Sequence, residues 1–507
     1  MAEHTRSRPF SLSGADLDQV RAALEAAGFD EASVAQALGV KGIAFLKDVP
    51  PELAWQRTSA GTPLHVLVRL FVIGGPVELQ SARMALAPAS IERLVEGGLL
   101  QPRGGAMRST VKMVPVDGLI IAFDRTWEGD TEEAADHVMG PSDGGRSLAN
   151  ITLRLAGADC LDLGTGCGFL ALLAARHGGR VVAADVNPRS GAFVELNARL
   201  NGIPGVEAVT GDLFAPVAGR KFDLVFSNPP YVISPDNRLV YMSGGMKGDA
   251  FCRRIVAEVP AFLREGGHFQ MICNWIEEDG EDWASRLRTW FEGTGCDAWV
   301  LRSSTTDPRT YALTWMNIGR HDPAGDERRL EEWLSYYREQ GAHSIGAGIV
   351  TMKKRPEARG PAWFRAFNGP PRVLGPSGDA VRERMEALDF LQTVTGDEAL
   401  MASVFLASPK ARLTQECEPT PAGWAQVSAH VHIQEGLAYV EEVDTYVAEL
   451  ITACDGHRTL RAAIDRTVAA TGGEPGSAPA ETADIVRQLV DEGFLLPVRA
   501  GAPGAEG

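Results

Sequence analysis

Cysteine is scarce in this sequence, and no two cysteines stand close together. Seven of them are spread singly through 507 residues: Cys160, Cys167, Cys252, Cys273, Cys296, Cys417 and Cys454. A disulfide framework or a zinc site needs cysteines in pairs or clusters, such as Cys-x-x-Cys. The pattern therefore predicts reduced thiols in a cytoplasmic protein and no bound metal.

Long apolar runs are also missing. No stretch approaches the roughly 20 apolar residues that cross a bilayer. The first residues, MAEHTRSRPFSLSG, lack the apolar segment of a secretory signal. Hydrophobic residues make up 45% of the chain and charged residues 23%, as in soluble globular proteins. The length is too great for one compact domain, so we expect several domains and no membrane association.

Positive charge is in the minority. Lysine and arginine number 49 against 66 aspartates and glutamates, which gives a net charge of -17. No run of Lys and Arg with interleaved aromatic residues is present. Because an acidic surface repels phosphate backbones, the composition disfavours a nucleic-acid partner, although it leaves one open. A protein or peptide partner agrees better with this charge.

Changes in pattern along the chain predict its domain organisation. The expected parts are an N-terminal helical, winged-helix-like domain over 1–109, a β-hairpin and linker over 110–145, an α/β domain over 146–320, a helix-strand extension and linker over 321–377, a C-terminal α+β winged-helix-like domain over 378–498, and a disordered tail over 499–507. The winged-helix interpretation rests on two similar segments, IERLVEGGLLQP and IVRQLVDEGFLLP. Each predicts a helix, a Gly turn and a leucine-rich strand.

The α/β domain alternates strand and helix patterns, which is typical of a parallel sheet covered on both faces. The expected strands are DCLDLG, RVVAAD, VEAVTGD, FDLVFSNPP, GHFQMICNW, DAWVLRSS and RTYALTWMN. Only a short turn, SSTTDPR, separates the last two, so they are expected to form an antiparallel hairpin. Five parallel strands closed by this hairpin predict a seven-stranded, Rossmann-like sheet.

The segment DLGTGCG, residues 162–168, follows an apolar strand and opens a helix. Its glycines let the backbone pass close beneath a ligand at the positive end of the helix. The residues expected to contact that ligand are Gly164, Thr165, Gly166 and Gly168. Phe169 stands where a dinucleotide fingerprint has its third glycine, so a pyrophosphate is not expected. The carboxylate of Asp162 instead suits a ligand with an ammonium group.

Two further acidic residues end the next two strands. Asp185 follows RVVAA, about 20 residues after the first glycine, where a carboxylate can bind both ribose hydroxyls. Asp212, in TGDLF, is placed to bind an adenine amino group, and the backbone N–H of Leu213 is placed to bind the ring. Adenosine and an ammonium group together predict S-adenosylmethionine as the cofactor.

The fourth strand ends in Asn-Pro-Pro-Tyr, residues 228–231. The two prolines end the strand abruptly and leave the carbonyl of Pro229 without a partner in the strand. That carbonyl and the side-chain oxygen of Asn228 can accept both hydrogens of an NH2 group, and Tyr231 can lie against its flat face. These residues predict methyl transfer to a planar nitrogen, with Asn228 bordering both cofactor and acceptor.

DLGTGCG, Asp185, GDLF and NPPY, in this order, resemble the class I methyltransferases of the small-domain group. Within it they are most similar to the release-factor glutamine N5-methyltransferases, and SGGMKGDAFCRRI (243–255) is similar to that family's Gly-rich loop. The resemblance covers roughly 110–318 and implies a seven-stranded fold that uses S-adenosylmethionine. The chain departs from the family before the first strand, where HVMGPSDGGRS replaces an acidic, proline-rich loop.

Three hypotheses follow for the activity. The favoured one is an N-methyltransferase acting on a protein or peptide amide of the glutamine type. The second is an RNA or DNA base methylase, because NPPY is shared with adenine-N6, cytosine-N4 and guanine-N2 methylases. The third is a winged-helix regulatory or scaffold protein that only senses the cofactor.

Overall fold

The computed structural model describes most of the chain: residues 10–125, 136–235, 244–280, 282–316, 323–356, 362–370, 372–421, 423–474 and 479–498. The chain divides into two compact units, unit 1 (1–149 with 155–366) and unit 2 (150–154 with 367–507). The expected disordered tail over 499–507 and much of the expected linker, over 126–135, lie outside the described residues. Within the described residues, no helix combines the length and apolar character needed to cross a membrane.

Unit 1 begins with short helices, as the sequence predicts. The first, α1, starts at a capping box in which Ser13 Oγ accepts from Asp16 N and Asp16 Oδ2 accepts from Ser13 N. The N-terminal helices are α1 (Gly14–Ala26), α2 (Glu31–Leu38), a 3-10 turn (Ile43–Asp48), α3 (Pro51–Arg57), α4 (Pro63–Leu67) continued by a π turn (Val68–Ile73), α5 (Leu79–Ala85) and α6 (Ile91–Glu96).

Two antiparallel hairpins follow these helices. The first joins β2 (Leu100–Arg103) to β3 (Ala106–Ser109), and β1 (Val77–Glu78) pairs with the other side of β3. The second joins β4 (Val111–Val116) to β5 (Leu119–Asp124). Its turn, Asp117-Gly118, has φ of 49° and 71°, the left-handed pair that a two-residue hairpin favours. Helices and hairpins occur where the sequence predicts them, and the winged-helix assignment stays a prediction.

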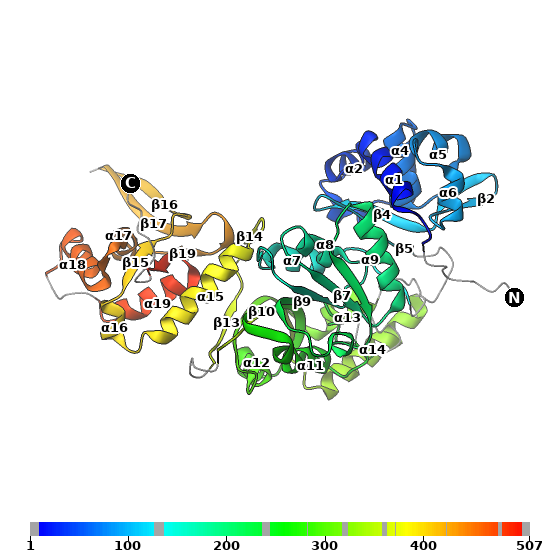
Figure 1. The fold of residues 1–507 in the computed structure, drawn as a ribbon. Coiled ribbons are helices and arrows are strands. Elements are labelled where there is room, and N and C mark those ends of the chain that lie inside the picture. The colour runs from blue at the N-terminus through cyan, green and yellow to red at the C-terminus, as the bar shows by residue number, and fades with distance from the viewer. Residues whose placement is uncertain are drawn as a thin grey trace. The chain divides into compact units, whose positions relative to one another are not determined.

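The β4–β5 hairpin lies beside helix α9 (Pro188–Leu200) of the α/β domain (Figure 1). Asn197 of α9 and Asn201, the C-cap residue of this helix, attach the hairpin to it. Asn197 accepts from the N–H of Ala122 and donates to its carbonyl, and Asn201 does the same with Ile120, all at 2.8 Å. Four helical residues rise about 6 Å and two strand residues span about 6.6 Å. The two side chains therefore match the spacing of β5 and act like a neighbouring strand.

The core of unit 1 is an eight-stranded sheet in the order β13-β11-β12-β10-β9-β6-β7-β8. Its strands are β6 (Cys160–Leu163), β7 (Val181–Asp185), β8 (Val206–Thr210), β9 (Phe222–Ser227), β10 (Leu263–Glu277), β11 (Cys296–Thr306), β12 (Ser344–Lys354) and β13 (Phe364–Asn368). The five strands β6 to β10 are parallel, as predicted, and β12 runs antiparallel to β10 and β11.

Helices cover both faces of this sheet, with α8 and α9 on one side and α11 and α12 on the other (Figure 1). The remaining bounds are α7 (Asp143–Ile151), α8 (Phe169–Ala175), a 3-10 turn (Ala215–Val217), α11 (Ala250–Glu258), a 3-10 turn (Val259–Phe262), α12 (Trp283–Phe291), α13 (Pro308–Met316) and α14 (Pro323–Glu339). Four of these helices, α8, α9, α11 and α12, lie where the sequence predicts them.

The predicted end of the sheet is wrong. RTYALTWM, residues 309–316, belongs to helix α13 and not to a strand, while Asn317 lies outside the described residues. The strand that pairs antiparallel with β11 is instead β12, from the predicted extension. Aromatic and β-branched residues give RTYALTWMN its strand-like composition. Packing overrides that preference, because Tyr311, Ala312 and Met316 are buried against α14 at helical spacing. The sheet therefore has eight strands instead of seven and extends beyond the predicted boundary at residue 320.

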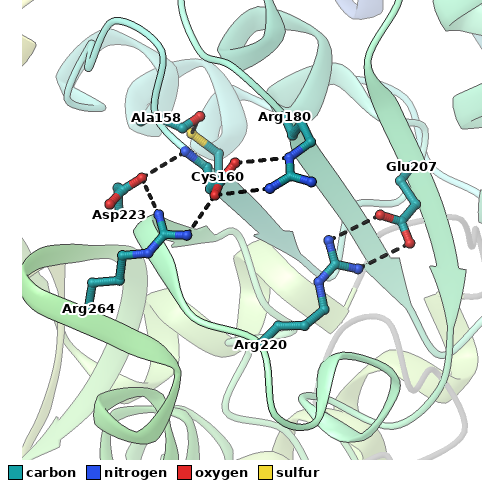
Figure 2. A network of polar contacts seen from close by, with 8 residues as sticks. Ala158, Cys160, Arg180, Glu207, Arg220, Asp223 and Arg264 are labelled. Carbon is teal, nitrogen blue, oxygen red and sulfur yellow. Dashed lines mark hydrogen bonds and ion pairs between the residues drawn. The ribbon is translucent and has the colours of Figure 1, made fainter.

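Ion pairs tie the parallel strands together at their amino ends (Figure 2). Arg264 of β10 bridges Asp159, just before β6, at 2.6 Å and Asp223 of β9 at 2.5 Å. Arg180, just before β7, adds a contact of 3.2 Å to Asp159. Arg264 and Arg180 hold the pKa of Asp159 below its usual range. This cluster lies at the edge of the sheet opposite to the carboxyl ends of the strands.

Unit 2 is a smaller α+β body, as expected from the sequence. Its strands form the sheets β20-β15-β21 and β16-β17-β19 and the pair β14-β18. Its elements are β14 (Arg372–Leu374), α15 (Gly378–Thr393), α16 (Asp397–Met401), β15 (Val404–Ala407), β16 (Ala411–Thr420), β17 (Gly423–Ile433), β18 (Gly436–Ala438), β19 (Val440–Glu442), α17 (Thr445–Ala453), β20 (Asp455–Thr459), α18 (Leu460–Ala470), α19 (Thr482–Glu492) and β21 (Leu495–Pro497). A buried cluster around Phe405, Leu450 and Phe494 forms its core.

Replacing Asn197 by alanine is expected to lower the free energy of unfolding of unit 1 by about 3 kcal/mol, because three buried backbone groups lose their partners. These groups are the N–H and carbonyl of Ala122 and the carbonyl of Cys167. Urea unfolding followed by tryptophan fluorescence measures the change, since every tryptophan except Trp424 belongs to unit 1. Asn201→Ala, at a less buried site, should cost less. An equal or smaller loss in Asn197→Ala would contradict the attachment described above.

Candidate active site

The loop between β6 and α8 has a backbone that glycine alone adopts easily. Gly164, Gly166 and Gly168 have φ of 77°, 53° and 85°, in the left-handed region that disfavours other residues. A Cβ atom on Gly164 or Gly166 would meet nothing within 4 Å. Glycine is therefore required at these positions by the backbone conformation and not by crowding. The N–H groups of Gly164 and Thr165 both donate to the carbonyl of Ala184 in β7, which holds the loop against the sheet.

Asp162 lies behind this loop and does not line the cavity in front of it. Its side chain is fully buried, and Oδ2 accepts from Thr165 Oγ1 at 2.7 Å and from Ala171 N at 3.0 Å. Oδ1 is buried without a hydrogen-bond partner among the described residues. Burial raises the pKa of this carboxyl to about 7. Asp162 fixes the loop to the first turn of α8. Its predicted role toward an ammonium group, held directly or through water, stays a prediction.

Asp185 lies at the end of β7, where the sequence predicts a ribose-binding carboxylate. Its Oδ2 accepts from Gly166 N and its Oδ1 from Asn187 N, both at 2.8 Å. Burial raises its pKa, against the effect of these hydrogen bonds. Each carboxylate oxygen can accept a second hydrogen bond. The side chain therefore fits a pair of adjacent hydroxyls while it holds the glycine loop in place.

Asp212 and Leu213 follow β8 and also border the cavity. The side chain of Asp212 is 65% exposed, and Arg254 Nη2 lies 3.3 Å from its Oδ2. Sequence reasoning missed this arginine as a partner, although it lies in the Gly-rich segment SGGMKGDAFCRRI. Leu213 has a φ of 45°, rare for a branched residue. Its backbone N–H has no hydrogen-bond partner among the described residues, which suits the predicted bond to an adenine ring.

Asn228 ends β9 on the other side of the cavity. Its Nδ2 donates to Ser142 Oγ at 3.3 Å, and its Oδ1 is buried without a partner among the described residues. Burial raises the pKa of the nearby Tyr231, so its hydroxyl stays protonated. The Tyr231 ring meets Trp315 of α13 edge to face, with 6.2 Å between centroids. An unsatisfied buried acceptor beside a flat aromatic ring is suited to receive an N–H group.

One cavity of about 380 Å³ brings most of the predicted residues together. It is bordered by Gly164, Thr165, Gly166, Asp185, Asp212, Leu213, Asn228, Pro229 and Tyr231. Asp162 and Gly168 do not border it. Sequence reasoning missed Ser142, Phe251 and Trp315, which do. In the sequence, only the segment HVMGPSDGGRS, at the position of the family's acidic, proline-rich loop, draws attention to Ser142, whereas Trp315 lies in RTYALTWMN, which predicts a strand.

Helices α13 and α14 hold the segment that follows Asn-Pro-Pro-Tyr. Ile233 N donates to Tyr311 Oη at 3.2 Å, and Tyr337 Oη donates to the carbonyl of Ile233 at 2.9 Å. Asn274 Nδ2 donates to the same Tyr311 hydroxyl at 2.6 Å. All of these groups are buried, so the backbone beyond Tyr231 has one defined position. The helices inserted between β11 and β12 thus help to form the acceptor side of the cavity.

This combination of fold and site defines a class of protein. The parallel strands carry a glycine loop after β6, a carboxylate at the end of β7 and Asn-Pro-Pro-Tyr at the end of β9, around one cavity. These are the features of a class I methyltransferase. The family described as "Methyltransferase small domain" matches residues 142–279. Two families described as domains of unknown function match residues 26–110 and 383–497.

Known proteins are similar over the same part of the chain. A release factor glutamine methyltransferase of Gloeobacter violaceus is 30% identical over 38% of this chain and 68% of its own length. A ribosomal RNA small subunit methyltransferase C of Alcanivorax borkumensis is 32% identical over 22% of this chain and 31% of its own length. The crystal structure of a methyltransferase from Pyrococcus furiosus covers 42% of this chain and 82% of its own, with 18% identity and a TM-score of 0.27.

The chain belongs to the class I S-adenosylmethionine-dependent methyltransferases of the small-domain group. The similarity is partial, because the chain spans from 31% to 65% of the length of five other curated relatives that it matches. The residues present fit the cofactor of this family. The ribose would be held by Asp185. The adenine would be held by the N–H of Leu213, which has no partner among the described residues. The amino-acid part would occupy the open space above Gly164 and Gly166.

Asp162→Asn should change how stability depends on pH. The folded pKa of about 7 lies above the ordinary value of 3.8. At a pH between these two values, the folded state therefore binds a proton at Asp162 that the unfolded state has lost. The contribution of Asp162 to stability therefore falls as pH rises from about 4 to about 7. Asparagine can accept the same two hydrogen bonds without a charge. Calorimetry at about pH 5 and pH 8 should show the variant gaining stability relative to the parent at the higher pH; an unchanged difference would contradict this.

Asp185→Ala should weaken cofactor binding by about 100-fold, as expected for the loss of two hydrogen bonds to a charged group. Isothermal titration with S-adenosylmethionine measures the dissociation constant directly. Asp185→Asn keeps acceptor oxygens and should lose less. Glu207→Ala is the matched control, since its exposed carboxylate is paired with Arg220 and does not border the cavity. Unchanged affinity in Asp185→Ala, measured on folded protein, would show that the ribose lies elsewhere.

Proposed function

We propose that this protein is an N-methyltransferase that acts on a planar nitrogen, with a protein or peptide amide of the glutamine type as the favoured acceptor. The observation that carries the proposal is the buried, unpartnered Oδ1 of Asn228 at the wall of the cavity. A buried acceptor is costly unless a donor reaches it. The N–H of an acceptor amide would supply that donor.

The residues around Asn228 can prepare such a nitrogen for methylation. S-adenosylmethionine, when bound, would supply a sulfonium methyl group: the nitrogen lone pair would form the new N–C bond, the S–C bonding pair would stay on sulfur, and one N–H proton would leave to water. Asn228 Oδ1 and the carbonyl of Pro229 would accept hydrogen bonds from the two N–H groups of the substrate amide. This arrangement withdraws the nitrogen lone pair from conjugation with the carbonyl. Tyr231 would hold the flat face of the group, so the contribution of the protein is positioning and electrostatics.

The charge of the site supports a protein acceptor. Among the residues that the structure describes, those that border the cavity include no lysine or arginine, and the whole chain carries a net charge of -17. Nucleic-acid enzymes use cations to hold phosphates beside the reacting base. The similarity to the release factor glutamine methyltransferase of Gloeobacter violaceus supports the same choice.

A base methylase is the second candidate function. One observation favours it: the aromatic side chains of Tyr231, Phe251 and Trp315 border the cavity, and extruded or unpaired bases stack on such side chains. The relative from Alcanivorax borkumensis is a ribosomal RNA methyltransferase by name.

A regulatory or scaffold role is the third candidate function. In this role the chain would bind the cofactor without transferring a methyl group. The two flanking families of unknown function are compatible with it.

We propose a cytoplasmic location for any of the three functions. All seven cysteines are free, and six are buried, as is typical of proteins in a reducing compartment.

Labelling of a cell extract separates the three functions. The purified chain is incubated with methyl-labelled cofactor and extract, and the products are then treated with protease or with nuclease. We expect label that protease releases and nuclease does not. Label released only by nuclease would establish a base methylase. Cofactor binding without any transfer would establish the regulatory role.

Asn228→Ala should slow methyl transfer by about 100-fold or more, because the variant loses a hydrogen bond made to the reacting group. Cofactor affinity should stay unchanged. The rate comes from single-turnover transfer and the affinity from titration of the same preparation. A loss of cofactor affinity that matches the loss of rate would show that Asn228 serves cofactor binding alone.

A further inference from the structure

The start of helix α7 lies directly against the acceptor side of the cavity. Ser142 Oγ accepts from the N–H of Gly145 at 3.0 Å and from Asn228 Nδ2 at 3.3 Å. These two bonds use both lone pairs of the hydroxyl oxygen. Ser142 thus joins the first turn of α7 to the amide that ends β9. This contact joins residues 86 positions apart in the chain.

The orientation of the Asn228 amide decides what it can bind. Only Oδ1 can accept a hydrogen bond from an N–H group, while the NH2 end of the same amide repels another NH2 group. With Nδ2 bonded to Ser142, Oδ1 is the end left without a partner. In the reverse orientation the Ser142 hydroxyl would donate to Oδ1, and the NH2 end would point toward an incoming amide. The bond from Nδ2 to Ser142 Oγ is therefore the arrangement that leaves Oδ1 able to accept from the methyl acceptor.

A glycine lets α7 approach this closely. A Cβ atom on Gly144 would lie 2.7 Å from Tyr231 Oη and 3.6 Å from Asn228 Oδ1. Gly144 has no positive φ, so space and not backbone conformation requires glycine there. A Cβ atom on the next residue, Gly145, would make only ordinary contacts, the one to Asn228 Nδ2 at 3.6 Å. The first turn of α7 is packed against both side chains that would bind the acceptor.

We propose that Ser142 is a positioning residue, which holds the Asn228 amide with Oδ1 toward the methyl acceptor, and that Gly144 lets the start of α7 pack against this site. The inference rests on the proposed function, in which Asn228 binds the acceptor nitrogen. Ser142 acts through Asn228 and need not touch the reacting atoms. No family match or relative assigns it a role.

A first test needs no methyl acceptor. Protein carrying 15N-asparagine is examined by NMR, and the Asn228 side-chain signal is assigned by its loss in Asn228→Ala. In the parent the NH2 hydrogens should exchange slowly, because Nδ2 is partly buried and hydrogen-bonded to Ser142. In Ser142→Ala their exchange should be at least about 10-fold faster. Ser147→Ala is the matched control, since the hydroxyl of Ser147, within α7, donates to the carbonyl of Asp143. Equal exchange in the parent and Ser142→Ala would overturn the proposal.

A second test measures methyl transfer in a double-mutant cycle. Ser142→Ala should lower kcat by about 10-fold without changing cofactor affinity, and Ser142→Thr, which keeps a hydroxyl, should retain most of the rate. In the Asn228→Ala background, removal of Ser142 should have no further effect, because its target is gone. An equal loss of rate in both backgrounds would overturn the proposal and leave the proposed function standing. If the Asn228 side-chain amide exchanges slowly but no methyl transfer is detected, the proposed function would be contradicted, while the positioning of Asn228 by Ser142 would stand.

Discussion

The parallel pairing of β6 with both of its neighbours is the constraint on which the rest of the site depends. Cys160–Leu163 pairs with β7 on one side and with β9 on the other, in the same direction. The chain therefore leaves β6 toward one half of the sheet and returns later to the other, which opens a crevice at the carboxyl ends. The glycine loop, Asp185 and Asn228 all begin where these strands end. Ion pairs at the opposite edge hold the same strands in register.

Much of this arrangement could be predicted, because each motif directly follows a short apolar strand and the geometry of parallel sheets brings strand ends together. The part that could not be predicted depends on contacts between distant residues. RTYALTWMN has the composition of a strand, and only its packing against α14 makes it helical. Asp162 has the right position for a ligand contact but is turned inward by Thr165 and Ala171. The contact of Ser142 with Asn228 joins residues 86 positions apart, so the role of Ser142 becomes visible only in the structure.

The parts of unit 1 outside the five parallel strands support the cavity from several directions. Asn197 joins β5 to the carbonyl of Cys167 in the glycine loop, so the β4–β5 hairpin supports the cofactor side of the cavity. On the acceptor side, Tyr311 and Tyr337 hold the backbone at Ile233, and Ser142 holds the Asn228 amide. Both halves of the cavity are thus fixed by side chains from elements outside the motifs. A buried polar network of this kind fixes one arrangement, because each group that loses its partner is costly.

The most direct measurement is a crystal structure of the chain with S-adenosylhomocysteine, the product of the cofactor. Our account predicts that both ribose hydroxyls lie within hydrogen-bond distance of Asp185 and that the adenine ring accepts from the N–H of Leu213. It also predicts that the sulfur faces Asn228, whose Oδ1 points into the space beside it. A ribose bound away from Asp185, or a sulfur turned away from Asn228, would contradict the account.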